Sequence, residues 1–208
     1  MEGSLKMKQI LVIFAILLLL FFAFQCGDKK KPNNPNLEDP GYYFPINFEY
    51  KWTYARLNRQ CVVVEDSFVI SAVNKNTRPE GSGWDLVSSG GGTTFVYRRG
   101  DTIFTKEIGS TPLPSKVLVG PIRTGTYWKD LRGHEYNILG FEDVHSAAAG
   151  GTYYGCAKIK RTSSGDPEVT YLWWAPQIGK VRREKKDQSG QCVSGEELRR
   201  LDKSPHFP

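Results

Sequence analysis

Apolar residues follow two different patterns along this chain. An unbroken apolar run of 15 residues extends from Ile10 to Phe24, shortly after Lys6 and Lys8. From Tyr42 onward, short runs rich in β-branched and aromatic residues alternate with clusters of Gly, Asn, Asp and Ser, without the period of about 3.6 residues that marks a helix. The first pattern predicts an N-terminal apolar helix, and the second predicts a domain that is almost entirely β.

The second pattern predicts about a dozen strands. Arg99-Gly100-Asp101 and Ser163-Ser164-Gly165-Asp166 supply tight reversals between neighbouring runs. Consecutive hairpins make an antiparallel meander, and this many short strands bury one face only by curling or packing in two layers. We therefore expect a mainly β fold, a single antiparallel meander curled into a half-barrel or barrel-like sheet, with a sandwich as the alternative. The expected strands are 44–56, 61–73, 84–88, 93–98, 102–108, 116–121, 125–129, 135–144, 153–162, 169–174, 180–186 and 196–201.

The N-terminal apolar run has the composition of an export signal. Basic residues precede it and it stops at Cys26, where a cysteine favours lipoprotein processing over plain cleavage. Gln25 departs from the familiar bacterial lipobox, which places a small residue directly before the cysteine. We expect acyl chains on Cys26, and the alternative is an uncleaved membrane anchor. The stretch Gln9–Gly27 contains 19 residues without a charge, and about 20 apolar residues span a bilayer.

The leader divides the chain into three predicted parts. These are a lipoprotein signal peptide at 1–25, a disordered tether at 26–40 that is rich in Lys, Asn and Pro, and a β domain at 41–208. Several acyl chains, such as palmitate, anchor a domain stably, so Cys26 would suffice to hold the protein at a membrane. Gly27 stands where the best-known inner-membrane retention signal has aspartate. We therefore expect the outer membrane, with the domain facing the periplasm.

The charge balance is basic. The whole chain carries +6, and loss of Lys6, Lys8 and Glu2 with the signal leaves +5. An exported, tethered chain has little access to nucleic acid, which we therefore exclude as a partner. The densest basic segment is 180–186, where strand alternation places Arg182 and Arg183 on opposite faces. We interpret this segment as a solvated strand end rather than a polyanion site.

Three cysteines remain once Cys26 is committed to lipid. An oxidising compartment permits one disulfide among Cys61, Cys156 and Cys192 and leaves one free thiol. Cys156 lies in an apolar alternating stretch and resembles a small core residue. Elimination favours the pair Cys61 and Cys192, with the two other pairings left open.

Two stretches carry a resemblance to a known group of proteins. Residues 43–54 read Tyr-Phe-Pro-Ile-Asn-Phe-Glu-Tyr-Lys-Trp-Thr-Tyr, and residues 171–181 read Tyr-Leu-Trp-Trp-Ala-Pro-Gln-Ile-Gly-Lys-Val. They resemble the opening (Tyr-Phe-Pro-Leu, Gly-Asn, Trp-x-Tyr) and closing (Tyr-Tyr-Ala-Pro-Gly-Val-Gly-Leu-Val-Lys) elements of a group of uncharacterised bacterial lipoproteins. Residues 120–128 and 150–156 resemble the group's two middle elements, whereas Phe48-Glu49 and Gln177 depart from the pattern. The resemblance implies an antiparallel β domain similar to the open half-barrels of lipoprotein carriers, and implies no established activity.

The sequence holds no recognisable catalytic motif. It has neither the G-x-S-x-G element of esterases nor a phosphate-binding loop with its lysine. Glu142 and Asp143 beside His145 are more often surface residues than an acid/base group. The histidines are scattered and no C-x-x-C occurs, so we expect no metal, no cofactor and no enzyme activity.

Tryptophans are the candidate ligand contacts. Trp52, Trp128, Trp173 and Trp174 lie on predicted strands, and adjacent Trp173 and Trp174 must point to opposite faces. Aromatic side chains either fill a β core or line a concave binding face. We expect a membrane-anchored envelope lipoprotein whose domain binds a lipid or another apolar ligand. The alternative is a structural lipoprotein that contacts another envelope protein and holds no small ligand.

Overall fold

The structure is a computed structural model that describes residues 35–45, 50–109 and 113–202. The predicted signal peptide and Cys26 lie outside these residues. From Pro35 onward the chain forms one compact unit. No helix in the described ranges is long and apolar enough to cross a membrane.

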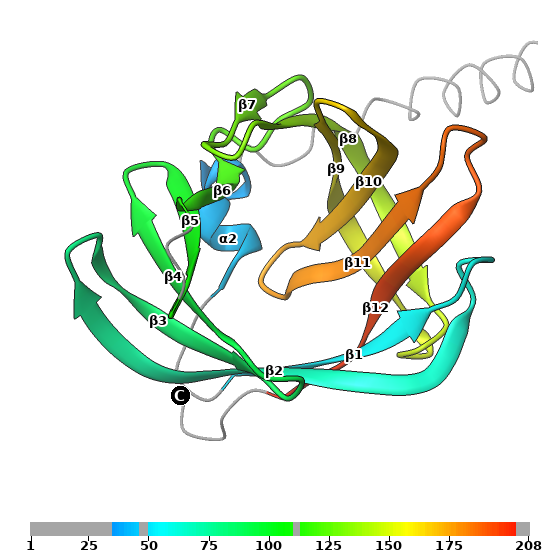
Figure 1. Ribbon diagram of the computed structural model, residues 1–208, viewed down its shortest axis with the longest axis horizontal. Helices are drawn as coiled ribbons and strands as arrows, with labels where there is room; N and C mark the ends of the chain where they lie inside the picture. Colours follow the sequence, from blue (N-terminus) through cyan, green and yellow to red (C-terminus); the bar gives the residue numbers. More distant parts are fainter. Residues whose placement is uncertain (1–34, 46–49, 110–112, 203–208) are drawn as a thin grey trace, which may run out of the picture. The chain divides into compact units, whose positions relative to one another are not determined.

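The described residues form a single antiparallel sheet of twelve strands (Figure 1). The strand order is β6-β5-β4-β3-β2-β1-β12-β11-β10-β9-β8-β7, so every neighbouring pair is consecutive in sequence except β1 and β12. The strands are β1 (Lys51–Leu57), β2 (Val63–Arg78), β3 (Gly81–Ser88), β4 (Thr93–Arg99), β5 (Thr102–Glu107), β6 (Ser115–Val119), β7 (Tyr127–Lys129), β8 (His134–Ser146), β9 (Gly151–Ser163), β10 (Asp166–Ala175), β11 (Gly179–Lys186) and β12 (Cys192–Asp202).

The sheet curls until its two edge strands, β6 and β7, approach each other (Figure 1). The prediction of a mainly β, antiparallel, barrel-like sheet is therefore confirmed. No backbone ladder between β6 and β7 occurs in the described residues, and side chains bridge this seam instead. Trp128 Nε1 donates to Lys116 O at 3.2 Å, and Ser115 Oγ donates to Asp130 Oδ2 at 3.0 Å.

Asp130 is the centre of the seam. Its carboxylate is fully buried and also accepts hydrogen bonds from the backbone N–H groups of Arg132 and His134. Burial opposes ionisation, but the hydrogen bonds from His134 and Ser115 outweigh it, so the pKa of Asp130 is lowered. The buried, charged carboxylate of Asp130 thus links β6 to the β7–β8 turn, where no backbone hydrogen bonds of the described residues join the two edge strands.

Residues 35–45 fill one end of the space that the sheet encloses. The 3-10 helix η1 (Pro35–Glu38) and the single helical turn α2 (Pro40–Tyr43) lie inside the curve of the strands (Figure 1). Asp39 caps α2 by accepting from Gly41 N at 2.6 Å, and Pro40 occupies the first helical position, where its missing N–H costs nothing. The carbonyl of Tyr42 accepts from Gln177 N at 2.7 Å, which ties the segment to the β10–β11 turn. We call residues 35–45 the plug.

The plug corrects two predictions. The tether was expected to reach residue 40, but residues 35–40 belong to the folded unit because Pro40 is buried and Glu38 O accepts from Ile122 N at 2.8 Å. The first strand was expected from Phe44, but it begins at Lys51. Phe44 instead packs on Trp174 with ring centroids 5.0 Å apart, so its apolar side chain serves the plug rather than a ladder.

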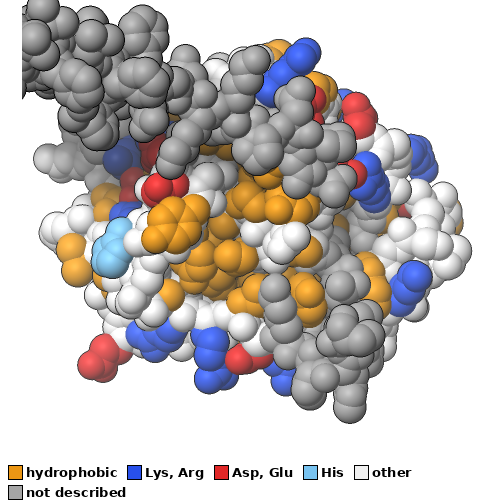
Figure 2. Space-filling view, turned by 180° about the vertical axis from the view of Figure 1, so that it is seen from behind, with side chains coloured by type: hydrophobic (Ala, Val, Ile, Leu, Met, Phe, Trp, Pro, Cys, Tyr) orange, Lys and Arg blue, Asp and Glu red, His pale blue; other side chains and the backbone are white. Residues whose placement is uncertain are grey.

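Two apolar clusters support the sheet. The first joins Tyr43 of the plug to both walls, including Val96 on β4 and Ile159 on β9. The second packs β1, β10, β11 and β12 against the β8–β9 hairpin around the buried Leu198. Hydrophobic side chains also gather in the middle of the face seen in Figure 2, with charged side chains toward its edge. Figure 2 is seen from behind Figure 1, so these side chains lie within the ring of strands at its other end.

A disulfide joins two turns of the sheet. Cys61 in the β1–β2 turn and Cys192 at the start of β12 are bonded, with their Cα atoms 5.6 Å apart. This is the pair that elimination favours. Cys156 is a free, fully buried thiol on β9, and burial raises its pKa to about 12. A thiol with this pKa is protonated at neutral pH, so Cys156 acts as a small core residue.

Candidate functional site

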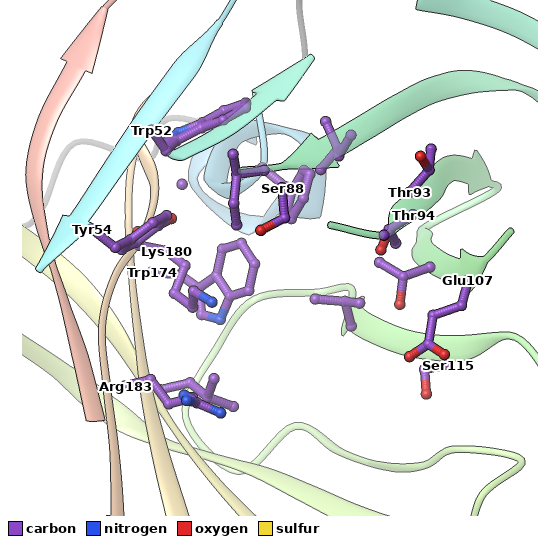
Figure 3. Close-up of a pocket in the computed structure, with 18 of the residues that line it drawn as sticks. Trp52, Tyr54, Ser88, Thr93, Thr94, Glu107, Ser115, Trp174, Lys180 and Arg183 are labelled. Atoms are coloured by element: carbon purple, nitrogen blue, oxygen red, sulfur yellow. The ribbon is translucent and has the colours of Figure 1, made fainter. Parts of the chain in front are cut away.

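The curled sheet encloses a cavity of about 690 Å³. This volume lies within the range of about 300–1,000 Å³ that is usual for small-molecule sites. Side chains from ten elements of the sheet and from the plug line it, and Figure 3 shows them projecting inward from opposite walls. Trp52, Tyr54 and Lys180 lie on one side of this view, and Thr94 and Glu107 lie on the other.

The plug end of the cavity is apolar. Phe44 and Pro45 close it, and Trp52 and Trp174 line the wall beside them. Trp52 Nε1 donates to Ile178 O at 2.8 Å, which fixes the indole against the β10–β11 turn. The backbone approaches this ring closely at Gly179, where φ is +103° and a Cβ would lie 3.3 Å from Trp52 Nε1. A glycine at this position therefore lets the indole pack against the turn.

The four predicted tryptophans divide into two pairs. Trp52 and Trp174 line the cavity, whereas Trp128 and Trp173 do not. Trp128 stacks on Tyr136 at 5.0 Å beside the seam. Trp173 points to the opposite face of β10, where its Nε1 donates to Glu142 Oε1 at 2.6 Å. Glu142 thus has a structural partner in Trp173.

One wall of the cavity carries two cations that share one carboxylate. Lys180 and Arg183 project inward from β11. The buried Glu196 of β12 forms a close ion pair with Lys180, whereas its Oε2 lies 3.4 Å from Arg183 Nη2. Burial opposes ionisation of Glu196, but the charges of Lys180 and Arg183 outweigh it and lower its pKa. Lys180 Nζ also lies 5.1 Å above the Tyr54 ring, a cation–π distance.

A third cation lies on the same side, on β9. Arg161 lines the cavity and donates from Nη2 to Thr170 Oγ1 at 3.2 Å. No carboxylate of the described residues forms an ion pair with Arg161. Its cross-strand neighbour Tyr136 has a pKa raised to about 12 by burial and by the nearby Asp130, so this phenol stays neutral.

The opposite wall is polar but less charged. Thr93, Thr94 and Ser115 present hydroxyl groups, and Glu107 is the only carboxylate among the described lining residues. Glu107 Oε1 lies 3.9 Å from Arg132 Nη1, a distance at which two exposed charges attract only weakly. Four cations and one carboxylate therefore line the cavity, and Glu196 contacts two of these cations from the neighbouring strand β12. Aromatic side chains dominate the plug end, where Lys180 is paired with Glu196, and the less compensated Arg183 and Arg161 lie farther from the plug.

The basic segment 180–186 is not a solvated strand end. On its inner face Lys180 and Arg183 line the cavity, and on its outer face Arg182 is paired with two buried carboxylates. Arg182 lies 2.6 Å from Glu184 Oε1 and 3.0 Å from Glu197 Oε2. The segment is enclosed because β12 supplies Glu196 and Glu197, which pair with the cations on the two faces.

Sequence reasoning missed Arg161, Lys180 and Arg183 as site residues. A signal was nevertheless present in the alternation of β9. Arg161 lies on the same face of β9 as Ala157 and Ile159, both of which are fully buried. A charge placed in an inward-facing series indicates an interior partner or ligand. The described residues contain no group of three or more His, Cys, Asp or Glu side chains that could hold a metal ion.

Comparison with known proteins identifies a shared fold. No model of a known protein family matches the chain, and no curated protein matches it. The solved structure of a "putative exported protein with YmcC-like fold" from Bacteroides fragilis is 15% identical, with a TM-score of 0.50, and the match covers 76% of this chain and 97% of that chain. The chain therefore shares the fold of that protein.

Two further solved structures are more distantly similar. A "putative lipoprotein" from Parabacteroides distasonis is 16% identical with a TM-score of 0.47, covering 77% of this chain and 98% of that chain. A DUF1329 family protein from Desulfovibrio piger is 11% identical with a TM-score of 0.31, covering 85% of this chain and 95% of that chain.

Replacement of Glu196 tests the cationic wall. Glu196→Gln leaves Lys180 and Arg183 without their shared carboxylate, and we expect it to lower the free energy of unfolding at pH 7 by about 3 kcal/mol in urea titrations. Because the folded-state pKa of Glu196 lies below its ordinary value of 4.5, its contribution is fully present above that pH and is lost as the pH falls through the folded-state value. The difference from the unaltered protein should therefore shrink below about pH 4.5.

Glu65→Gln is the matched control for this test. Glu65 is exposed on β2, so the same substitution there should change the free energy of unfolding by less than about 0.5 kcal/mol. Equal effects at the two positions, or a Glu196→Gln effect that does not depend on pH, would contradict the ion-pair assignment.

Proposed function

We propose that this chain is a bacterial envelope lipoprotein whose barrel-like domain holds a lipid or other apolar ligand inside its sheet. The observation that carries the proposal is the cavity of about 690 Å³ with an apolar end formed by Phe44, Trp52 and Trp174. Large aromatic side chains line this space without filling it. A barrel of about eight strands is just wide enough for its own side chains or one small ligand, so a curled sheet of twelve strands has room for a ligand.

The anchoring part of the proposal rests on the leader sequence. A basic start, the apolar run Ile10–Phe24 and the cysteine at its end support export and acylation of Cys26. The resemblance of residues 43–54 and 171–181 to a group of bacterial lipoproteins supports the same assignment. We place the domain at the outer membrane, facing the periplasm, where its cavity would be close to lipid.

A second candidate function is docking to another envelope protein without a small ligand. The hydrophobic side chains exposed in the middle of the view in Figure 2 support it, because exposed apolar patches often mark interaction sites. This function makes no use of an open, charged interior. The cavity therefore favours the ligand-binding proposal.

A cavity-filling variant tests ligand binding. Thr94 projects into the cavity from β4, so Thr94→Trp should occupy space that an acyl chain would use (Figure 3). We expect a photoreactive fatty acid to label cavity peptides of the full chain in lipid nanodiscs. We expect Thr94→Trp to reduce this labelling about tenfold, equivalent to roughly 1.4 kcal/mol of binding energy. Mass spectrometry of the crosslinked peptides measures both the site and the yield.

Thr77→Trp is the matched control, since Thr77 is exposed on β2 outside the cavity. It should leave labelling unchanged. Labelling spread evenly over outer-face peptides, or equal labelling of both variants, would reject a ligand inside the sheet and favour the docking function.

Replacement of Cys26 tests the anchor. Cys26→Ala should abolish metabolic labelling by an alkyne analogue of palmitate, because it removes the thiol that the acyl chains would occupy. Fractionation should then show the protein either released or retained with its leader uncleaved. A variant that loses no label would disprove acylation at Cys26. An unaltered chain that is never labelled and keeps residues 1–25 would establish the uncleaved anchor instead.

A further inference from the structure

The interior of the sheet has more positive charge than its own carboxylates neutralise. Lys180 and Arg183 share Glu196, which pairs closely with Lys180 and lies 3.4 Å from Arg183. A charge-assisted hydrogen bond is usually about 2.7–2.9 Å long, so Arg183 is only partly compensated. Its Nε is in addition a buried donor with no acceptor among the described residues.

Arg161 adds a second uncompensated cation on the same side of the cavity. Its contact with the Thr170 hydroxyl at 3.2 Å is neutral, and no described carboxylate pairs with it. Arg161 lies on β9 and Arg183 on β11, so the two side chains enter one cavity from strands separated only by β10. Arg183 is about a third exposed and Arg161 is half-buried, so both cations remain within reach of an anionic ligand.

The charged and apolar parts of the cavity are arranged in order along the strands. Trp174 contacts Phe44 of the plug, Leu172 lies two residues earlier on β10, and Thr170 beside Arg161 lies two residues earlier again. Lys180 lies opposite Trp174 but is closely paired with Glu196, whereas Arg183 and Arg161, which lack a close carboxylate among the described residues, lie opposite Leu172 and Thr170, farther from the plug. A ligand that matches this order has an apolar tail and an anionic head.

We infer that the cavity binds an amphiphile with an anionic head group, a carboxylate or a phosphate, which is held by Arg161 and Arg183 while the tail lies against Trp52 and Trp174. This inference rests on the proposed function and specifies its ligand class. Guanidinium groups suit it because their planar donors match the oxygens of carboxylate and phosphate. Tyr136, beside Arg161, stays a neutral phenol at physiological pH and adds no negative charge to the head-group site.

Two photoreactive probes with the same tail test this inference. One ends in a carboxylate and the other in an alcohol, and both are offered to the full chain in phosphatidylcholine nanodiscs. We expect the carboxylate probe to label cavity peptides about tenfold more efficiently at subsaturating concentration. Arg161→Gln should lower its labelling to the level of the alcohol probe, and Arg161→Lys should retain part of the difference because the charge remains.

Lys160→Gln is the control for surface charge. Lys160 is adjacent to Arg161 on β9 but does not line the cavity, so its loss should not change the preference for the carboxylate. Equal labelling by the two probes would overturn the anionic head group and leave the proposed function standing. If neither probe labels cavity peptides, both the anionic head group and the proposed function are overturned.

Two competitors separate the sources of the anion. Hexadecyl phosphate and palmitate should each displace the carboxylate probe, and the ratio of their effects identifies the preferred head group. Inorganic phosphate and acetate lack a tail and should not compete at millimolar concentration. Full competition by either small anion would show that the site holds a free anion and would overturn the amphiphile.

Discussion

The pairing of β1 with β12 is the contact on which the rest of the fold depends. Lys51 lies opposite Asp202, so strands from the two ends of the domain meet in the middle of the sheet. Without this ladder, β1–β6 and β7–β12 would be two separate meanders, and neither would enclose a cavity. The neighbouring β11–β12 hairpin brings Glu196 to Lys180 and Arg183. The cationic wall is thus local to one hairpin, whereas the cavity that it faces depends on the long-range pairing of β1 with β12.

Charge on the inside explains why the enclosed space stays open. The aromatic side chains at the plug gain by leaving water, as in any β core, whereas Arg161 and Arg183 would lose several kcal/mol if the walls closed on them without an anion. A cavity with one apolar end and one cationic end is therefore a compromise between burial and hydration. An amphiphile satisfies both ends at once, and water alone satisfies only one.

The sequence was sufficient to predict the class of the fold and insufficient to predict the site. Alternation placed twelve strands and showed that Trp173 and Trp174 lie on opposite faces, because a strand has a period of two residues. It could not show that Trp174 is the inner one, since this depends on the direction in which the sheet curls. The prediction of a strand from Phe44 was wrong. The run of apolar residues from Phe44 indicated a strand, whereas Asp39-Pro40, just before it, is a typical helix start. The compensation of Arg183 by Glu196 depends on the register of β12, which no local pattern encodes.

Quenching of tryptophan fluorescence by brominated fatty acids tests the central claim most directly. With the full chain in nanodiscs, bromine near the methyl end of the chain should quench more strongly than bromine beside the carboxylate. This excess should fall in Trp174→Phe and largely disappear when Trp52→Phe is added, because both indoles lie at the apolar end with the plug. The reverse order, or quenching that is the same at both positions and unaffected by Trp174→Phe, would contradict an amphiphile held tail-first inside the sheet.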